Sequence, residues 1–262
     1  MKINVIYNKF IPEYEAALTT VIKSLTEYGV NYDVFDLEDM KFGGDMSFVI
    51  GGDGTLLRAA RFYSEFKKPV LGINMGRLGF LSQAAVSDID SVIKSVITGK
   101  YSVEDRLMLE SGEHLALNDF VVKGCTPGRT SKFFLEVNNK VVCDYIADGI
   151  IISTPTGSTA YGLSAGGPIL YPDLGAIVIV PICPHTLNAR PLVVPSSELI
   201  AVKTNDELLS VSIDGFVTTN YVEKVDIKAS PHRAKLIFPE NNNFYVVLRN
   251  KLNWGVSPEC KY

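Results

Sequence analysis

The tripeptide Gly-Gly-Asp occurs twice, at residues 43–45 and 51–53, and either carboxylate could take part in chemistry. The second copy follows the apolar run 47–50 and opens a helix-like stretch, whereas the first copy precedes that run. In open α/β sheets, ligands bind outside the carboxyl ends of the strands, where glycines and a helix N-terminus suit phosphate groups. A carboxylate there would repel phosphate, unless it takes a proton from an attacking hydroxyl group or binds a metal ion. We therefore expect chemistry at Asp53, with capping of the helix as its alternative role, and a solvated turn at Asp45.

A second candidate is the hydroxyl-rich loop that follows the apolar run 149–154. Its hydroxyl groups, a glycine that allows close backbone approach and a tyrosine ring suit a ribose, a phosphate or an adenine ring. The residues concerned are Thr156, Gly157, Ser158, Thr159 and Tyr161. The alternative is a polar loop in which the tyrosine is incidental.

Other common motifs do not account for these loops. The sequence has no G-x-x-x-x-G-K-[ST], and the loop at 51–55 lacks G-x-G-x-x-G. Gly162–Gly166 does match the G-x-S-x-G of serine hydrolases, and Asp214 and His232 follow in the required order. That motif needs an apolar strand directly before it, and here the preceding residues are rich in hydroxyl groups and glycine. We therefore disfavour a hydrolase.

The composition limits the partners of the chain. It has 262 residues, 47% of them hydrophobic, and a net charge of −4, so there is no basic field to hold a nucleic acid. The apolar runs are too short to span a bilayer, and the N-terminus lacks a signal-peptide layout. The four cysteines and three histidines show no metal-ligand spacing. We therefore expect a cytoplasmic protein without a nucleic-acid partner, a membrane partner or a metal-ligand set of its own.

The sequence predicts two parts of different structure. Before residue 100, apolar runs alternate with helical patterns such as residues 12–29. After that point, short β-rich runs broken by Asn, Gly, Asp and Pro predominate, and residues 137–141 could form a hairpin turn. We expect an α/β domain with a parallel, Rossmann-like sheet at 1–100, and a β-rich domain with a layered sheet or sandwich at 101–242. Residues 243–262 would form a tail that packs back on the first domain.

Six stretches of the chain, in order, resemble the NAD kinase family over nearly the whole length. The long block Ala147–Ile169 is the most specific, because a loop like Gly51–Thr55 also occurs in diacylglycerol and sphingosine kinases. The stretches are Gly51–Thr55, Gly72–Leu81, Leu115–Asp119, Ala147–Ile169, Pro181–Pro195 and Leu248–Gly255. The resemblance implies phosphorylation of the 2′-hydroxyl of the adenosine ribose of NAD to give NADP, with ATP or polyphosphate as donor. It also implies Mg²⁺ or another divalent metal ion bound with that donor, and a homo-oligomer, either a dimer or a tetramer.

The same resemblance implies roles for particular residues. Asp53 would be the catalytic carboxylate at the NAD site, with Gly54 beside it and Arg58 as a candidate phosphate contact. Asp148 would lie at the nicotinamide end and could serve a neighbouring subunit. The other implied NAD contacts are Phe80, Asn118, Asp119, Arg129, Thr156, Thr159, Ala160, Tyr161, Gly162, Leu163 and Ser164.

Two alternatives use the same loop differently. A lipid kinase of the diacylglycerol or sphingosine type would place Gly51–Thr55 beside an apolar groove, but it gives no reason for the hydroxyl-rich loop. A protein that only senses NAD or NADP would bind through that loop without needing Asp53. Both are therefore less well supported than an NAD kinase.

Overall fold

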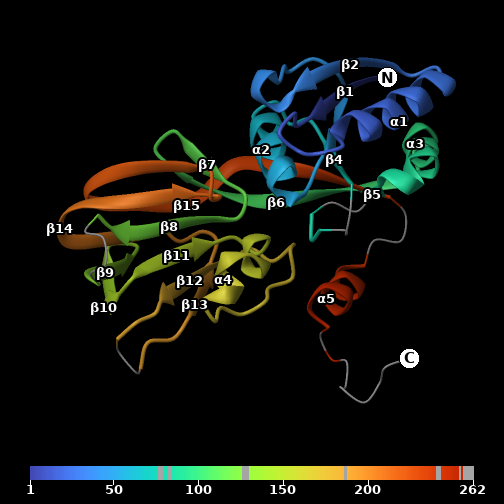
Figure 1. The fold of residues 1–262 in the computed structure, drawn as a ribbon. Helices are drawn as coiled ribbons and strands as arrows, with labels where there is room; N and C mark the ends of the chain where they lie inside the picture. Colours follow the sequence, from blue (N-terminus) through green and yellow to red (C-terminus); the bar gives the residue numbers. More distant parts are fainter. Residues whose placement is uncertain are drawn as a thin grey trace. The chain divides into compact units, whose positions relative to one another are not determined.

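The computed structural model describes residues 1–75, 79–81, 84–125, 130–185, 188–239, 243–253 and 255, and the side chains of residues 206 and 207 are not described. The chain forms two compact units (Figure 1). The first contains residues 1–105 and the chain from 235 onward, and the second contains residues 106–234. The chain therefore leaves the first unit within strand β6 (Tyr101–Ser111) and returns to it within strand β15 (Val217–Pro239).

The first unit is built on a parallel sheet in the order β2-β1-β3-β4, as the alternation of strands and helices predicts. The end of β15 adds to this sheet beside β4, where Leu236 pairs in parallel with Val70. The short strand β5 (Ala84–Ala85) pairs with the other end of β4. The strands are β1 (Lys2–Tyr7), β2 (Asn31–Asp36), β3 (Met46–Ile50) and β4 (Val70–Asn74).

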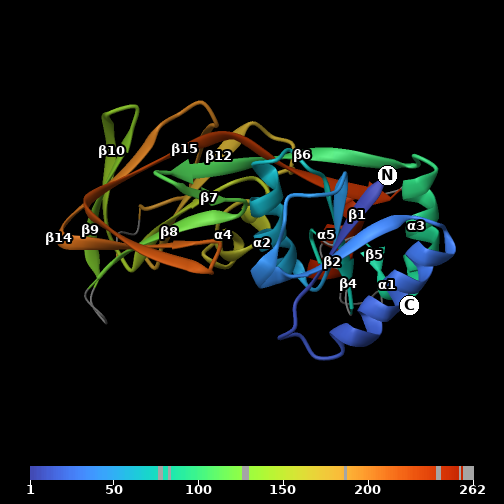
Figure 2. The ribbon, with the colours of Figure 1, turned by 90° about the horizontal axis from the view of Figure 1, so that it is seen from above.

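Helices cover both faces of this parallel sheet. Helices α1 (Tyr14–Glu27) and α3 (Ile89–Ile97) lie side by side and share one apolar core with β1, β3 and β4 (Figure 2). Helix α2 (Asp53–Ser64) packs on β3 and β4 from the other face, where Asn4 Nδ2 donates to the hydroxyl oxygen of Tyr63, 3.2 Å away. This two-sided covering explains why β3 and β4 are buried along their whole length.

The second unit is rich in antiparallel strands, again as expected from the sequence. Its strands pair in the order β13-β12-β11-β8-β14-β15, and β9 joins β14 to the hairpin partner β10. The turn of that hairpin is at Asn138 and Asn139, which both adopt the left-handed conformation (φ 49° and 60°), as the Asn-Asn pair in the sequence predicts.

The other elements range from single turns of helix to the long strand β14 (Ile200–Ile213). In the second unit they include β7 (His114–Ala116), β8 (Asp119–Gly124), β9 (Ser131–Val137), β10 (Lys140–Ala147), β11 (Gly149–Ser153), β12 (Ala176–Ile182), β13 (Leu192–Pro195), β14 (Ile200–Ile213), the 3₁₀ turn η3 (Gly157–Thr159) and α4 (Tyr161–Ser164). The first unit also has the 3₁₀ turns η1 (Leu37–Asp39) and η2 (Val86–Asp88) and the helix α5 (Phe244–Leu252). Of the described helices, none combines the length and apolarity needed to cross a membrane.

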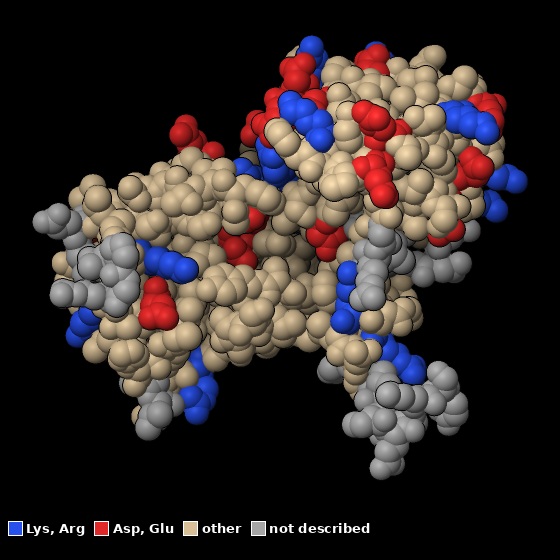
Figure 3. Space-filling model, viewed as in Figure 1, with Lys and Arg blue, Asp and Glu red and all other residues tan. Residues whose placement is uncertain are grey.

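The first Gly-Gly-Asp copy is a surface turn, as expected. The Asp45 carboxylate accepts the backbone N–H of Lys2 at 2.8 Å and lies 4.0 Å from the N-terminal ammonium group, and its side chain is 61% exposed. The side-chain amide of Asn4 holds the loop before it by donating to the carbonyl oxygens of Lys41 and Gly43. On the face of the first unit seen in Figure 3, acidic and basic side chains are interspersed.

Candidate active site

The second Gly-Gly-Asp copy lies at the carboxyl end of β3, where α2 begins. Gly52 is the N-cap of α2, and Asp53 is the first residue of the helix itself. The capping role considered for Asp53 is therefore wrong, because the cap position belongs to a residue without a side chain. A carboxylate in the first turn lies at the positive end of the helix dipole, where bound phosphate groups are also favoured.

The segment 79–80 fixes the direction of the Asp53 carboxylate. Its Oδ2 atom accepts the backbone N–H of Phe80 at 2.8 Å. Gly79 is so close that a Cβ atom there would lie 1.7 Å from Oδ1 of Asp53 and 2.3 Å from Oδ2. Only glycine can occupy this position without displacing the carboxylate, and this requirement was not visible in the sequence. The predicted contact residue Phe80 thus acts on Asp53 through its backbone.

Arg58 lies further along α2, after Asp53 and Gly54. Its Nη2 atom is 2.9 Å from Oε1 of Glu38, and the two side chains are 33% and 50% exposed. A phosphate group at Arg58 would compete with this ion pair. Breaking the pair would cost little, because surface pairs of this kind contribute about 0–1 kcal/mol.

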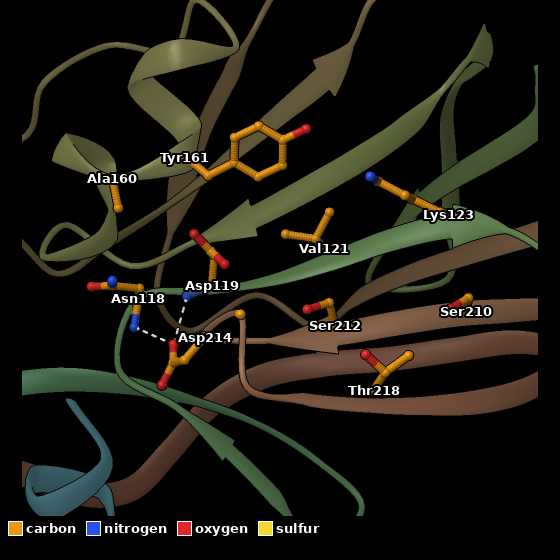
Figure 4. A pocket seen from close by; sticks show the side chains of 11 residues that line it. Asn118, Asp119, Val121, Lys123, Ala160, Tyr161, Ser210, Ser212, Asp214 and Thr218 are labelled. Carbon is orange, nitrogen blue, oxygen red and sulfur yellow. Dashed lines mark hydrogen bonds between the residues drawn. The ribbon is translucent and has the colours of Figure 1, made fainter. Parts of the chain in front are cut away.

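The second unit contains a cavity of about 540 Å³ at the start of β8 (Figure 4). It brings together four of the predicted NAD contacts, two from the turn before and at the start of β8 and two from the hydroxyl-rich loop: Asn118, Asp119, Ala160 and Tyr161. The other lining residues come from β8 and from the two strands that meet at the turn after β14: Val121, Lys123, Ser210, Ser212, Asp214, Gly215 and Thr218. A cavity of this size with a few convergent polar groups suits a small-molecule ligand.

The hydroxyl-rich loop packs directly on the turn that carries Asn118. The hydroxyl group of Thr154 donates to the carbonyl oxygen of Leu117 at 2.6 Å and accepts the N–H of Gly157 at 3.0 Å. A Cβ atom at Gly157 would lie 2.2 Å from the carbonyl oxygen of Asn118, so only glycine allows this approach. The hydroxyl-rich loop and the turn that carries Asn118 and Asp119 therefore form one wall of the cavity.

Other predicted contacts of the loop lie close to the cavity without lining it. Thr156 is buried, and its hydroxyl oxygen is 3.4 Å from Nη1 of the buried Arg106. Thr159 donates its hydroxyl to the carbonyl oxygen of Thr156 at 3.3 Å. Gly162 is buried, Leu163 is half-buried and Ser164 is exposed in the single turn α4.

One more predicted contact lies elsewhere, and another falls outside the described residues. Asp148 is exposed between β10 and β11, and its backbone N–H donates to the carbonyl oxygen of Ile182 at 3.0 Å. Arg129 lies outside the described residues. The exposed position of Asp148 is compatible with the role that the resemblance implies for it, a contact with a ligand of a neighbouring subunit.

Asp119 and Asp214 form a pair of buried carboxylates in the cavity. Burial, and in second place the charge of Asp214, raise the pKa of Asp119 from 3.8 to about 7. Asp214 was considered in the sequence only as part of a hydrolase motif. In the structure its carboxylate accepts the backbone N–H groups of Leu117, Asn118 and Asp119.

The sequence did not predict that the remaining lining residues belong to a binding site. Ser210, Ser212, Thr218 and Lys123 lie on alternating positions of strands, where polar side chains are ordinarily solvent-facing. The one available signal was the Asp-Gly pair after the strand at 208–213, which predicts a turn but says nothing of what the turn contacts.

Comparison with known families covers most of the chain. Residues 15–101 match the ATP-NAD kinase N-terminal domain, and residues 117–238 match the ATP-NAD kinase C-terminal domain. An NAD kinase of Azoarcus sp. (strain BH72) is 40% identical over 240 residues, which cover 87% of this chain and 82% of that protein. An NAD kinase of Pseudomonas paraeruginosa is 44% identical over 225 residues, or 80% of this chain and 76% of that protein.

Solved structures show the same fold. The structure of an NAD kinase from Archaeoglobus fulgidus in complex with ATP superposes with a TM-score of 0.82 at 27% identity, covering 97% of this chain and 98% of that one. A yeast NADH kinase complexed with NADH superposes with a TM-score of 0.85 at 23% identity, covering 100% of this chain and 90% of that one, and shows the fold alone. With both domains matched and relatives of 40% and 44% identity over most of its length, the chain belongs to the NAD kinase family.

Proposed function

We propose that the chain transfers a phosphoryl group from ATP or polyphosphate to the 2′-hydroxyl of the adenosine ribose of NAD, giving NADP. The observation that supports this proposal most directly is the placement of Asp53 at the N-terminus of α2. Its carboxylate is oriented there by the N–H of Phe80 and by the space at Gly79. Incubation of the purified protein with Mg-ATP or polyphosphate and NAD, with NADP measured enzymatically, tests this proposal. Absence of NADP with either donor would contradict it.

The family assignment makes the chain an NAD kinase and leaves the lipid-kinase alternative without support, because both matched domains are NAD kinase domains. The lining of the cavity is also too polar to suit a lipid substrate, because it combines two carboxylates, one ammonium group and several hydroxyl groups. Such a lining suits a polar ligand with ribose hydroxyl groups.

In the proposed reaction, Asp53 accepts the proton of the 2′-hydroxyl as that oxygen attacks the terminal phosphorus of the donor. The bond from phosphorus to the bridging oxygen breaks, and ADP or the shortened polyphosphate leaves with the electron pair. Phosphoryl transfer depends on positioning more than on covalent help, so the fixed direction of the carboxylate is itself part of catalysis. General-base help of this kind is worth ~10²–10⁴-fold.

The cavity of the second unit is the proposed place for NAD. Asn118 and Asp119 offer an amide and a carboxylate for hydroxyl groups, and Tyr161 offers a ring face (Figure 4). Thr156, Thr159, Gly162, Leu163 and Ser164 would act from the same loop. For Gly54, Arg58, Phe80, Arg129 and Asp148, the family resemblance is the support for a role in NAD binding.

A divalent metal ion fits this site as a companion of the donor. Among the described residues, no cluster of three or more His, Cys, Asp or Glu side chains offers a protein cage for a metal ion. Mg²⁺ is commonly held largely by substrate phosphates, so the phosphates of the donor would be its main ligands here. Bound there, Mg²⁺ would neutralise charge that develops on the transferring phosphoryl group.

We also propose the division into an α/β domain at 1–100, an NAD-binding domain at 101–242 and a tail at 243–262 that returns to the first domain. The grouping of the chain from residue 235 onward with residues 1–105 supports this division. A layered arrangement of the second domain is supported by a large buried core, to which β8, β9, β11, β12, β14 and β15 all contribute, and by a smaller separate cluster formed by β8, β11 and β12. A homo-oligomer, with Asp148 reaching a neighbouring subunit, completes the proposal.

A further inference from the structure

One carboxylate holds three consecutive backbone N–H groups in the wall of the cavity. The Oδ1 atom of Asp214 accepts the N–H of Asn118 at 2.7 Å and that of Asp119 at 3.1 Å, and Oδ2 accepts the N–H of Leu117 at 3.0 Å. Hydrogen bonds to an ionised acceptor are roughly twice as strong as neutral ones. Asp214 is 7% exposed, so little water competes for these donors.

The carbonyl groups of the same three residues are also bonded. Leu117 accepts from the Thr154 hydroxyl at 2.6 Å, and Asn118 accepts from the Thr154 N–H at 2.9 Å. The carbonyl oxygen of Asp119 accepts the N–H of Asp214 at 3.0 Å. All six backbone polar groups of residues 117–119 therefore have a partner, and four of these six bonds go to Asp214.

Asp214 is itself placed by the tight turn between β14 and β15. Asp214 and Gly215 both adopt the left-handed conformation, with φ of 49° and 74°. Asp and Asn tolerate this conformation better than most residues, so the sequence Asp-Gly fits the turn. The turn aims the Asp214 carboxylate at the backbone of Asn118 and Asp119, while the Asp119 carboxylate points toward Ala160 and Tyr161 (Figure 4).

We propose that Asp214 is a positioning residue for NAD: its carboxylate clamps the backbone of residues 117–119 and so aims the Asn118 and Asp119 side chains at the ligand. This inference rests on the proposed function in one respect, the identity of the ligand. Asp214 acts through the turn and does not itself contact the reacting atoms.

Two substitutions isolate the clamp, because both keep the left-handed backbone. Asp214→Asn leaves one acceptor oxygen, and its NH₂ group faces a backbone donor, whereas Asp214→Gly removes every side-chain acceptor. We expect the KM and the Kd for NAD to rise about 10-fold for Asp214→Asn and up to about 100-fold for Asp214→Gly, because buried N–H groups that lose their acceptor are costly and the turn then loses its fixed position. The value of kcat at saturating NAD should change less than the KM in both variants.

Two further variants separate positioning from stability. Asp226→Asn makes the same chemical change at an exposed side chain of β15 that pairs with Lys224 at 2.8 Å, and it should leave NAD binding unchanged. Ile227→Ala removes a buried side chain from the core of the same strand and lowers the melting temperature without touching the turn. It should leave the Kd for NAD of the folded protein unchanged.

The decisive readout is the Kd for NAD, measured by calorimetry without a phosphoryl donor at a temperature where each variant is folded. A rise for the Asp214 variants but not for Ile227→Ala supports the clamp. Equal affinity of the wild type and Asp214→Asn, at a lowered melting temperature, would show a merely structural role and overturn this inference alone. A wild-type protein that binds no NAD would overturn the proposed function as well.

Discussion

The two units of the chain each direct a carboxylate, and they do so in different ways. In the first unit, Asp53 opens a helix, its carboxylate accepts the backbone N–H of Phe80, and Gly79 leaves space for it by having no side chain. In the second unit, Asp119 follows a turn, and its backbone N–H donates a hydrogen bond to the carboxylate of Asp214. The first arrangement constrains the side chain that is proposed to react. The second uses the buried carboxylate of Asp214 to constrain the backbone that carries side chains proposed to bind NAD. The side chain proposed to react and the side chains proposed to bind NAD are thus supported differently, and the substitutions below separate the two supports.

The largest effect is expected for Asp53→Asn, which removes the proposed general base. Turnover should fall at least ~10²-fold, because general-base help is worth ~10²–10⁴-fold, while the Kd for NAD stays largely intact. Steady-state measurement of NADP formation checks this result. Asp45→Asn is the matched control, since it makes the same change in the other Gly-Gly-Asp copy at an exposed turn and should leave turnover unchanged.

The next effect concerns pH and Asp119. Its pKa is raised from 3.8 to about 7, so the folded state binds the proton more tightly than the unfolded state does. The contribution of Asp119 to the free energy of unfolding is therefore fully present below pH ~4. It is lost as the pH rises through ~7, and the loss is on the order of 4 kcal/mol. Asp119→Asn should flatten this dependence and should unfold less readily than the wild type at pH 8.

Urea unfolding of both proteins at pH 5 and pH 8 measures this effect. The charged neighbours that line the same cavity are Asp214 and Lys123, and both are unchanged in the variant. The same difference in unfolding free energy between the two pH values in wild type and variant would contradict the assignment to Asp119.

Gly79→Ala should break the support of Asp53 without altering the second unit. The added Cβ atom would lie 1.7 Å from Oδ1 of Asp53, so the carboxylate or the backbone has to move. We expect turnover to fall about 10- to 100-fold with the Kd for NAD little changed. The matched control is Gly43→Ala, where an added Cβ atom meets nothing within 4 Å. Equal turnover of the two alanine variants would show that Gly79 does not support Asp53.

The smallest effect is expected for Thr154→Val, which acts on the other side of the Leu117–Asp119 turn. The change removes the donor to the Leu117 carbonyl oxygen and the acceptor of the Gly157 N–H, and both groups are buried. Buried polar groups left without partners cost about 1–3 kcal/mol. Thermal and urea unfolding should show this loss, together with a rise in the KM for NAD. Unchanged stability and KM would mean that the Asp214 side of the turn is sufficient alone.

Much of the fold and part of the candidate site could be predicted from the sequence, because the signals were local. The strand, glycine turn and helix around Asp53 lie within some twenty residues, and their order sets apart Asp53 from Asp45. Tyr161 was singled out with its hydroxyl-rich loop, but that loop alone does not identify its ligand, and Asn118 and Asp119 came from the resemblance to a family. Their gathering around one cavity required the structure.

The missed residues act over distances in sequence that pattern reading does not cover. Asp214 is separated by 95 to 97 residues from the three N–H groups that it accepts, and its own surroundings predict only a turn. Gly79 is needed because of Asp53, 26 residues earlier, and Glu38 pairs with Arg58, 20 residues later. In each case the partner is chosen by the packing of elements in three dimensions, not by spacing along the chain.

The central claim is a division of labour between Asp53 and Asp214, and a single matched measurement tests it. The kcat at saturating NAD and the Kd for NAD are to be determined for Asp53→Asn and Asp214→Asn, two variants with the same chemical change. We predict that Asp53→Asn binds NAD like the wild type but turns over at least ~10²-fold more slowly. Asp214→Asn should bind NAD about 10-fold more weakly and retain most of its kcat. Loss of kcat without loss of affinity in both variants, or near-wild-type turnover of Asp53→Asn, would contradict the account.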